Sequence, residues 1–216
     1  MINRTFKDYL INEMPIPTDW DKNKLGGRNS FASQIRYAKA RAKQIGAGSS
    51  RVAFVIPYEG RQTVLKIAKN GKGLAQNEHE ASIFNDYYFQ GLHIGIPMID
   101  HDENEPPSWI HTEFATKAKD SDFIKLTTLP LTKLIRYSEL MSGRQRTSNP
   151  NERQWVQELE EKLEDNDLVN SLVELISNYD LPTGDFTRLA NWGIYNGRPV
   201  IIDLGLSNDI MTNLYT

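Results

Sequence analysis

The sequence predicts an α+β protein with an antiparallel sheet in its N-terminal part and a small, mostly helical C-terminal part. Two short apolar runs, 52–56 and 63–68, are separated by a glycine-containing turn, which is typical of a β-hairpin. Apolar residues recur at helical spacing in three segments after residue 130. The turn Asn196-Gly197 between apolar runs predicts a second hairpin, because both central residues of such a turn need positive φ.

Composition limits the classes of function. A chain of 216 residues is long enough for one sizeable domain or two small lobes. Its net charge of -3 gives no general attraction to nucleic acid or to anionic membranes, so we expect neither as a partner. The sequence contains no cysteine, which excludes disulfides and thiolate metal sites and fits a reducing compartment. No long apolar segment or hydrophobic leader is present, so we expect a cytoplasmic protein.

The first 45 residues predict an arm and a helix. Residues 1–29 are irregular, and we expect an N-terminal arm lying on the domain. Ser30 can cap a helix that the apolar spacing extends to Ile45. The basic face 36–43 of this helix is typical of a solvated surface. A nucleic-acid accessory function that uses this face and the basic segment 144–153 is the weakest hypothesis, because the chain is acidic overall.

A glycine-rich segment and a strand lysine form the first candidate for chemistry. Gly46, Gly48 and Ser49 lead directly into a strand, which argues against Rossmann and P-loop sites, where a helix follows the glycines. Lys66 lies in the next strand, V-L-K-I-A. A lysine there either protects an exposed sheet edge or reaches a buried anion. The preceding glycine-rich segment favours the second interpretation.

A predicted helix, Leu74–Phe89, carries a glutamate on its apolar face. Glu80 shares that face with Phe84, and a buried carboxylate is costly without a partner. Lys66 is the natural partner. Glu78 is the alternative, although a solvated position is expected for it.

The remaining elements suggest a division near residue 118. A turn and short strand are expected at 91–100 and a further strand at 109–114, and a polar stretch follows at 115–122. The predicted units are an arm at 1–29, a lobe with its leading helix at 30–118, and a helical lobe at 119–216. Helices are expected in the last unit at 131–141, 151–164 and 167–178.

The stretch 184–205 holds a second candidate site. A polar loop carries Asp185, Arg188 and Asn191, and the predicted hairpin ends on Asp203. A hairpin places the start of one strand beside the end of the other, so Asn191 and Asp203 are expected to lie close together. Carboxylate and amide oxygens suit Mg²⁺. The alternative is an ordinary surface hairpin.

The order of these features resembles the protein-kinase-like fold. The resemblance spans roughly residues 40–210 and comprises the glycine-rich hairpin, the strand lysine, the helix glutamate and the Asp…Asn…Asp-x-Gly hairpin. The segments V-L-K-I-A-K-N-G-K-G-L-A-Q-N-E and G-D-F-T-R-L-A-N-W-G also resemble small kinase-like proteins encoded by tailed bacteriophages. That origin would place the protein in the host cytoplasm.

The resemblance implies ATP and Mg²⁺ as cofactors and a role for each candidate residue. Gly46, Gly48 and Ser49 would cover the nucleotide phosphates, Lys66 held by Glu80 would pair with the α- and β-phosphates, and the backbone of the segment from Glu113 to Ala115 would contact adenine. Asp185 would be the catalytic base, and Asn191 and Asp203 would hold Mg²⁺. Phosphoryl transfer asks mainly for positioning and for neutralisation of phosphate charge, which such groups supply.

Four features depart from the kinase pattern. Thr183-Gly184 precedes Asp185, which is more similar to aminoglycoside phosphotransferases. Asn191 follows Asp185 by six residues, where both families usually have five. Arg51 replaces the third glycine of the loop. Eleven residues follow Gly205, so we expect a truncated C-terminal lobe without an Ala-Pro-Glu activation segment.

Two functions therefore stay open. The first is an ATP-dependent phosphotransferase, an atypical Ser/Thr-type or small-molecule kinase that transfers the γ-phosphate to a hydroxyl acceptor. The second is a pseudokinase-like module that engages a host or viral protein without catalysis. The filled positions of lysine, glutamate, base and metal ligands favour the first, which we prefer. The truncated C-terminal lobe and the longer spacing between Asp185 and Asn191 favour the second.

Overall fold

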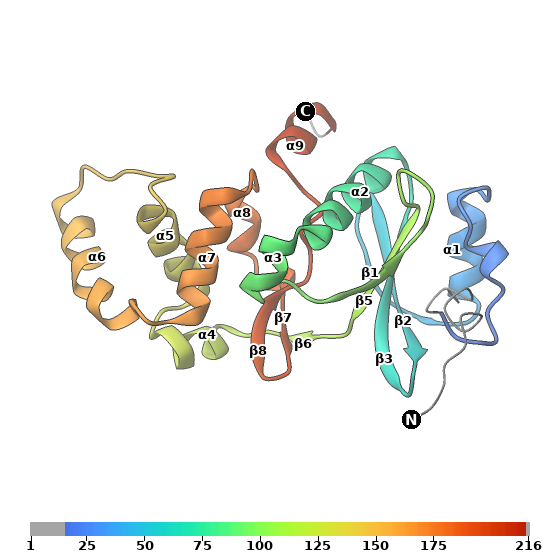
Figure 1. Cartoon of the computed structure of the whole chain (residues 1–216), viewed down its shortest axis with the longest axis horizontal. Coiled ribbons are helices and arrows are strands. Elements are labelled where there is room, and N and C mark those ends of the chain that lie inside the picture. Colours follow the sequence, from blue (N-terminus) through green and yellow to red (C-terminus); the bar gives the residue numbers. More distant parts are fainter. Residues whose placement is uncertain (1–15, 215–216) are drawn as a thin grey trace, which may run out of the picture.

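The computed structural model describes residues 16–214, and the elements form an elongated molecule. The large sheet lies toward one end and most of the helices toward the other, with the hairpin of β7 and β8 between them (Figure 1). The predicted fold class is confirmed: an α+β chain with an antiparallel sheet in its N-terminal lobe and a mostly helical C-terminal lobe.

The N-terminal lobe is built on a five-stranded antiparallel sheet with the order β1-β2-β3-β5-β4. Its strands are β1 (Lys43–Ala47), β2 (Arg51–Tyr58), β3 (Arg61–Ala68), β4 (Met98–His101) and β5 (Trp109–Glu113). Lys66 lies on the middle strand, opposite Ala53 on β2 and Ile110 on β5. Its neighbours Leu65 and Ile67 are fully buried on the other face, because side chains alternate along a strand.

Helix α1 (Phe31–Lys39) covers the face that carries Leu65 and Ile67. Ser30 caps it, since the Ser33 N–H donates to the Ser30 Oγ at 3.3 Å. The predicted extension of this helix to Ile45 is wrong, because residues 43–47 form β1 and pair with β2 instead. Ile45 continues the helical spacing of the apolar residues, but the pairing of this segment with β2 decides its structure.

The segment before α1 contributes to the same core. Ile16, Trp20 and Leu25 are buried in this cluster, on either side of the short 3₁₀ helix η2 (Lys22–Lys24). The part of the predicted arm at 1–15 lies outside the described residues. The limits of the predicted units stay a prediction.

The opposite face of the sheet carries α2 (Gly71–Asn85), which is followed by α3 (Tyr87–Leu92). The single helix predicted over 74–89 is therefore wrong in one respect, because it breaks at Asp86. Asp86 has an extended backbone, and its carboxylate accepts the Tyr88 N–H at 2.9 Å, which starts a new helix.

The start of α2 lies very close to Ser50, the residue before β2. This contact gives a testable prediction. A Cβ on Gly73 would lie 2.2 Å from the Ser50 carbonyl oxygen, whereas a Cβ on Gly71 would meet nothing within 4 Å. We expect Gly73→Ala to lower the free energy of unfolding by about 1–3 kcal/mol through overpacking. Gly71→Ala, the matched control, should be neutral or stabilising by about 0.5–1 kcal/mol. Urea unfolding of both variants measures the difference, and equal stabilities would contradict the contact.

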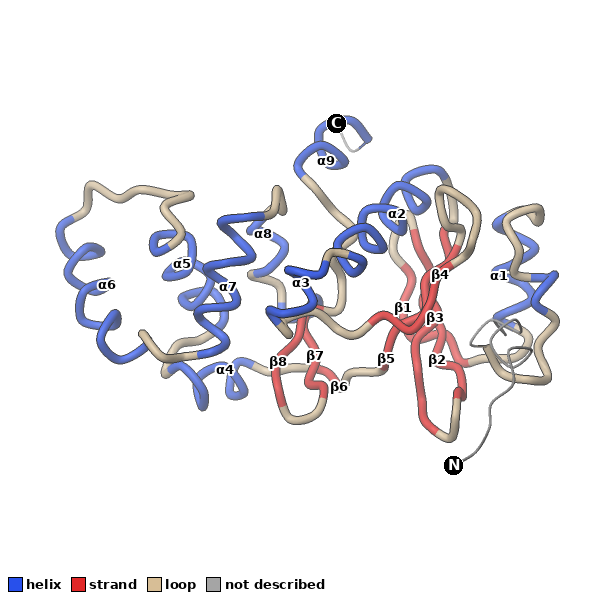
Figure 2. Tube along the Cα trace, viewed as in Figure 1, coloured by secondary structure: helices blue, strands red, loops and turns tan. Residues whose placement is uncertain are grey.

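The C-terminal lobe consists of helices around a three-stranded sheet with the order β6-β7-β8 (Figure 2). The helices are α4 (Asp120–Thr127), α5 (Leu131–Met141), α6 (Pro150–Leu163), α7 (Asp167–Asn178), α8 (Thr183–Phe186), η3 (Leu189–Asn191) and α9 (Asn208–Leu214). The strands are β6 (Thr116–Lys117), β7 (Trp192–Tyr195) and β8 (Arg198–Ile201). The helices predicted at 131–141, 151–164 and 167–178 are confirmed, whereas α4, α9 and β6 were not predicted. The predicted polar loop around Asp185 and Asn191 instead contains α8 and η3.

The predicted hairpin at Asn196-Gly197 is confirmed, with φ values of 49° and 79°. Trp192, at the start of β7, anchors it to the lobe. The Trp192 indole donates to the Phe186 carbonyl at 2.8 Å and packs edge-on against Phe123 at 5.1 Å. Buried aromatic side chains therefore hold the hairpin in the C-terminal lobe.

Backbone hydrogen bonds join the hairpin to the segment that enters the large sheet. The Ile96 N–H donates to the Ile201 carbonyl at 2.9 Å, and the Ile201 N–H donates to the Ile94 carbonyl at 2.7 Å. These bonds hold the end of β8 against the segment that leads into β4. No helix in the described range 16–214 is long and apolar enough to cross a lipid bilayer.

Candidate functional site

A cleft of about 580 Å³ lies between the large sheet and the β7–β8 hairpin. Both candidate regions of the sequence line it, although more than a hundred residues separate them. The predicted residues that line it are Gly46, Gly48, Ser49, Lys66, Glu113, Ala115, Asp185 and Asp203. Glu80 lies behind Lys66, and Asn191 lines a smaller adjoining cavity of about 120 Å³ together with Asp185 and Asp203.

Lys66 and Glu80 form a buried ion pair at the wall of the cleft. The Lys66 Nζ lies 2.5 Å from the Glu80 Oε1 and donates to the Ile202 carbonyl at 2.6 Å. Glu80 has no exposed surface, whereas Glu78 is exposed. The lysine therefore reaches a buried anion and protects no sheet edge.

Arg51 is the residue that the sequence did not assign to the site. It begins β2, and its side chain is 8% exposed. Its Nη1 lies 2.6 Å from the Glu80 Oε2, and its Nη2 forms an ion pair with the Asp203 Oδ1. The only sequence signal was an arginine where a kinase loop has its third glycine.

The surroundings of Arg51 leave room for its guanidinium. Its Nη1 also donates to the Asn77 Oδ1 at 3.3 Å. A Cβ on Gly205 would lie 2.7 Å from the Arg51 Nη2, so the glycine permits this close approach. Arg51 thus ties the glycine-rich hairpin to α2 and to the end of the β7–β8 hairpin.

Charge pairing shifts the pKa values of both ends of this link. Burial opposes the charge on Arg51, but Asp203 and Glu80 outweigh it and raise the pKa of Arg51 above its ordinary value. Desolvation likewise opposes ionisation of Asp203, but the charges of Arg51 and Lys66 hold its pKa below the ordinary value. Both groups are therefore charged at neutral pH.

Asp185 faces the cleft from α8. Its carboxylate is half-buried, and desolvation raises its pKa above the ordinary value, with Asp203 adding to the rise and Arg188 opposing it. The Arg188 Nη1 lies 3.5 Å from the Asp185 Oδ1 and is well exposed. A carboxylate with a raised pKa beside a cleft is suited to accept a proton.

The longer spacing between Asp185 and Asn191 is taken up by a helical turn. The Asn191 Nδ2 donates to the Asp185 carbonyl at 2.9 Å, and the Ile202 N–H donates to the Asn191 carbonyl at 2.9 Å. The hairpin therefore brings Asn191 to the strand end that carries Asp203, as predicted.

The segment from Glu113 to Ala115 connects the two lobes along one side of the cleft. The Glu113 carboxylate is held by the Arg61 Nε at 3.1 Å and the Arg61 Nη2 at 2.9 Å. Exposed apolar side chains stand at the mouth of the cleft, with Ile45 48% and Met211 39% exposed. Such surfaces can cover a planar apolar ring.

Mg²⁺ takes about six oxygen ligands, and Asp203 and Asn191 are the predicted side chains that would supply some of them. The Asp203 Oδ1 is engaged with Arg51 and also accepts the Gly205 N–H at 3.2 Å. The Asn191 Nδ2 donates to a backbone carbonyl, so the Oδ1 is the atom that a metal ion could use. Among residues 16–214, no three acidic or histidine side chains converge as a metal site. The assignment of Asn191 and Asp203 as Mg²⁺ ligands stays a prediction, and the pairing of the Asp203 Oδ1 with Arg51 does not suit the ion.

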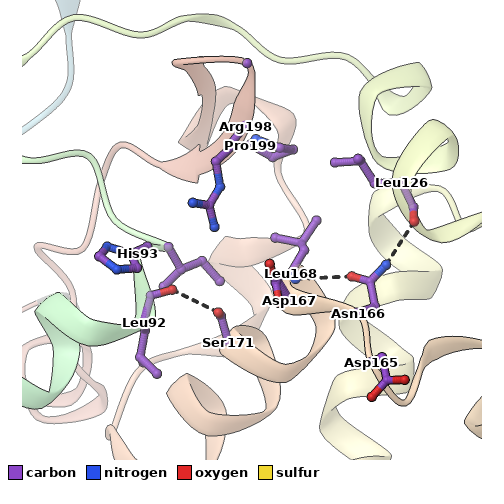
Figure 3. A pocket seen from close by; sticks show the side chains of 12 residues that line it. Leu92, His93, Leu126, Asp165, Asn166, Asp167, Leu168, Ser171, Arg198 and Pro199 are labelled. Carbon is purple, nitrogen blue, oxygen red and sulfur yellow. Dashed lines mark hydrogen bonds between the residues drawn. The ribbon is translucent and has the colours of Figure 1, made fainter.

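A second cavity, of about 290 Å³, lies in the C-terminal lobe (Figure 3). Its hydrogen bonds join neighbouring elements: the Ser171 Oγ donates to the Leu92 carbonyl and the Asn166 Nδ2 to the Leu126 carbonyl, each at 2.9 Å. None of the predicted site residues lines it. These two hydrogen bonds join α3 and α4 to α7 beside the cavity.

Comparison with family models and with curated proteins gives no match. Among solved structures, aminoglycoside phosphotransferase APH(4)-Ia is 18% identical with a TM-score of 0.27, over 50% of this chain and 35% of that one. The Mycobacterium tuberculosis PknI kinase domain is 12% identical with a TM-score of 0.36, over 77% and 58%. A thermostable APH(4)-Ia mutant in complex with ADP and hygromycin B is 15% identical with a TM-score of 0.31, over 77% and 66%.

This chain therefore spans about a third of the first of these proteins and under two thirds of the second. The strand order, the glycine-rich hairpin and the Lys66–Glu80 pair are observed in this chain itself, and the partial overlaps assign it no activity.

Proposed function

We propose that the cleft binds ATP and that the protein is an atypical phosphotransferase, which transfers the γ-phosphate to a hydroxyl acceptor. The observation that carries the proposal is the buried Lys66–Glu80 pair in a cleft that Asp185 also lines. A cation held in place by a buried carboxylate is suited to phosphate, and a half-buried aspartate is suited to accept a proton.

The proposed roles follow from the positions in the cleft. Backbone groups of Gly46, Gly48 and Ser49 cover the phosphates, and the segment from Glu113 to Ala115 contacts the base. Lys66 and Arg51 neutralise phosphate charge, as cations do in phosphoryl transfer. The acceptor oxygen attacks the γ-phosphorus while the bond to the β,γ-bridging oxygen breaks and ADP leaves. Asp185 takes the proton of the acceptor hydroxyl.

A second function is favoured by one observation, the ion pair between Arg51 and Asp203. A carboxylate engaged with a protein cation is withdrawn from metal binding, and this suits a nucleotide-binding module without catalysis. Such a module would engage another protein, and a host or viral protein is the candidate if the chain is phage-encoded.

Nucleotide binding tests the premise that both functions share. We expect millimolar ATP to raise the melting temperature of the wild type, because a ligand that binds only the folded state stabilises it. Lys66→Met should abolish this rise by removing the cation that faces the phosphates. Lys43→Met, an exposed strand lysine outside the cleft, is the matched control and should keep it.

The outcome separates three cases. Absence of a thermal shift in the wild type at millimolar ATP would overturn the nucleotide proposal. A shift accompanied by transfer of labelled γ-phosphate, to the protein itself or to a hydroxyl acceptor, supports the phosphotransferase. A shift without transfer to any acceptor supports the non-catalytic module.

A further inference from the structure

Arg51 pairs with one of the two carboxylate oxygens through which a divalent cation could bind Asp203, whose side chain is 47% exposed. Its guanidinium lies between two carboxylates that come from different lobes, Glu80 on α2 and Asp203 beyond β8. The side chain is 8% exposed, and the Asn77 Oδ1 and the space over Gly205 complete its surroundings. These contacts hold the guanidinium in a defined position. An arginine on the surface would have neither a buried carboxylate as acceptor nor the space that Gly205 leaves.

The charges around Arg51 are balanced without a metal ion. Two carboxylates, Glu80 and Asp203, face two cations, Arg51 and Lys66, in one connected set of ion pairs. A divalent cation on Asp203 would lie beside the guanidinium, where like charges repel in a partly desolvated cleft. An ion that used the Asp203 Oδ1 would also have to displace Arg51 and leave its charge buried without its second partner.

Both cations line the cleft as well as pairing with the carboxylates. A guanidinium presents a planar array of donors that matches phosphate oxygens, and Lys66 offers a compact charge next to it. Phosphates entering the cleft would therefore meet two positive groups that the protein holds in place.

We propose that Arg51 acts as the permanent counter-ion of Asp203 and makes the binding of a nucleoside triphosphate in this cleft independent of divalent cations. The inference rests on the proposed nucleotide function. It assigns Arg51 as a specificity-determining residue, because its guanidinium pairs with the carboxylate that the resemblance to kinases assigns to a metal ion.

Titration calorimetry with ATP, in EDTA and in excess Mg²⁺, tests the inference. We expect the Kd of the wild type in EDTA to be no more than about threefold weaker than in Mg²⁺. Arg51→Gln should weaken the binding of ATP in EDTA by about tenfold or more, because the cation is lost. Arg153→Gln, an exposed arginine on α6, is the control and should leave both affinities unchanged.

A second variant covers the case in which Arg51→Gln fails to fold. Asp203→Asn removes the carboxylate that a metal ion would need and leaves Arg51 paired with Glu80. ATP binding to this variant in EDTA should stay within about threefold of the wild type. Mn²⁺ titrated into the wild type without nucleotide should give no bound signal in electron paramagnetic resonance.

The failures are distinguishable. Wild-type binding that is more than about threefold weaker in EDTA than in Mg²⁺, or Mn²⁺ bound to the wild type and lost in Asp203→Asn, would overturn the inference while the nucleotide function stands. An absence of ATP binding in both buffers would overturn the nucleotide function and the inference with it.

Discussion

Replacing Glu80 by glutamine is expected to lower the free energy of unfolding by about 3–5 kcal/mol, because removing one partner of a buried ion pair leaves charge uncompensated. Glu80 has no exposed surface and accepts from both Lys66 and Arg51. The substitution leaves the shape nearly unchanged, so the loss reports charge and hydrogen bonding. Urea unfolding followed by tryptophan fluorescence measures it.

Glu78→Gln is the matched control for this prediction. Glu78 lies on the same helix, two residues earlier, and is exposed. Its change should stay within about 0.5 kcal/mol, as for most surface substitutions. A loss at Glu80 no larger than that at Glu78 would show that the two cations find other partners, and the buried set of ion pairs would then be wrong.

Asp185→Asn is expected to reduce γ-phosphate transfer by about 10²–10⁴-fold, the usual contribution of a general base. The amide cannot take the proton of the acceptor hydroxyl, yet it has nearly the size of the carboxylate. ATP affinity, measured by calorimetry, should therefore change little. Asp209→Asn, an exposed carboxylate on α9, is the control and should keep transfer and affinity unchanged.

The pH dependence of the wild type provides an independent measurement of the same role. Because desolvation raises the pKa of Asp185, the base is protonated and inactive over a range in which an ordinary aspartate is ionised. The kcat/KM for transfer should thus rise with pH through a value above the ordinary aspartate pKa. An Asp185→Asn variant with wild-type transfer, or a pH profile that does not change with this substitution, would exclude Asp185 as the base.

Several parts of the site were predictable because their signals are local. The Asn196-Gly197 turn needs positive φ, so two residues were enough to predict the hairpin. Lys66 and Glu80 could be paired because each broke an apolar pattern on its own element, and a buried charge needs a partner. The helices after residue 130 followed from apolar spacing alone.

Errors arose where two local states had similar support. The segment after α1 continued the helical spacing as far as Ile45, and only its pairing with β2 made it β1. The chain from α2 to α3 kept a helical pattern, but capping by Asp86 interrupted it. The pattern of a single sequence does not show which strand a segment will pair with. It also does not show whether a capping side chain will interrupt a helix.

The pairing of Arg51 with Asp203 could be known only from the folded chain. The two residues lie 152 positions apart, and neither breaks an apolar pattern, so no periodicity connects them. Sequence pattern determined which groups in this protein carry charge and indicated burial for Lys66 and Glu80, but not for Arg51. Packing of the hairpin against the large sheet decided which opposite charges meet, because burial forces each charge to the partner that the tertiary arrangement brings within reach.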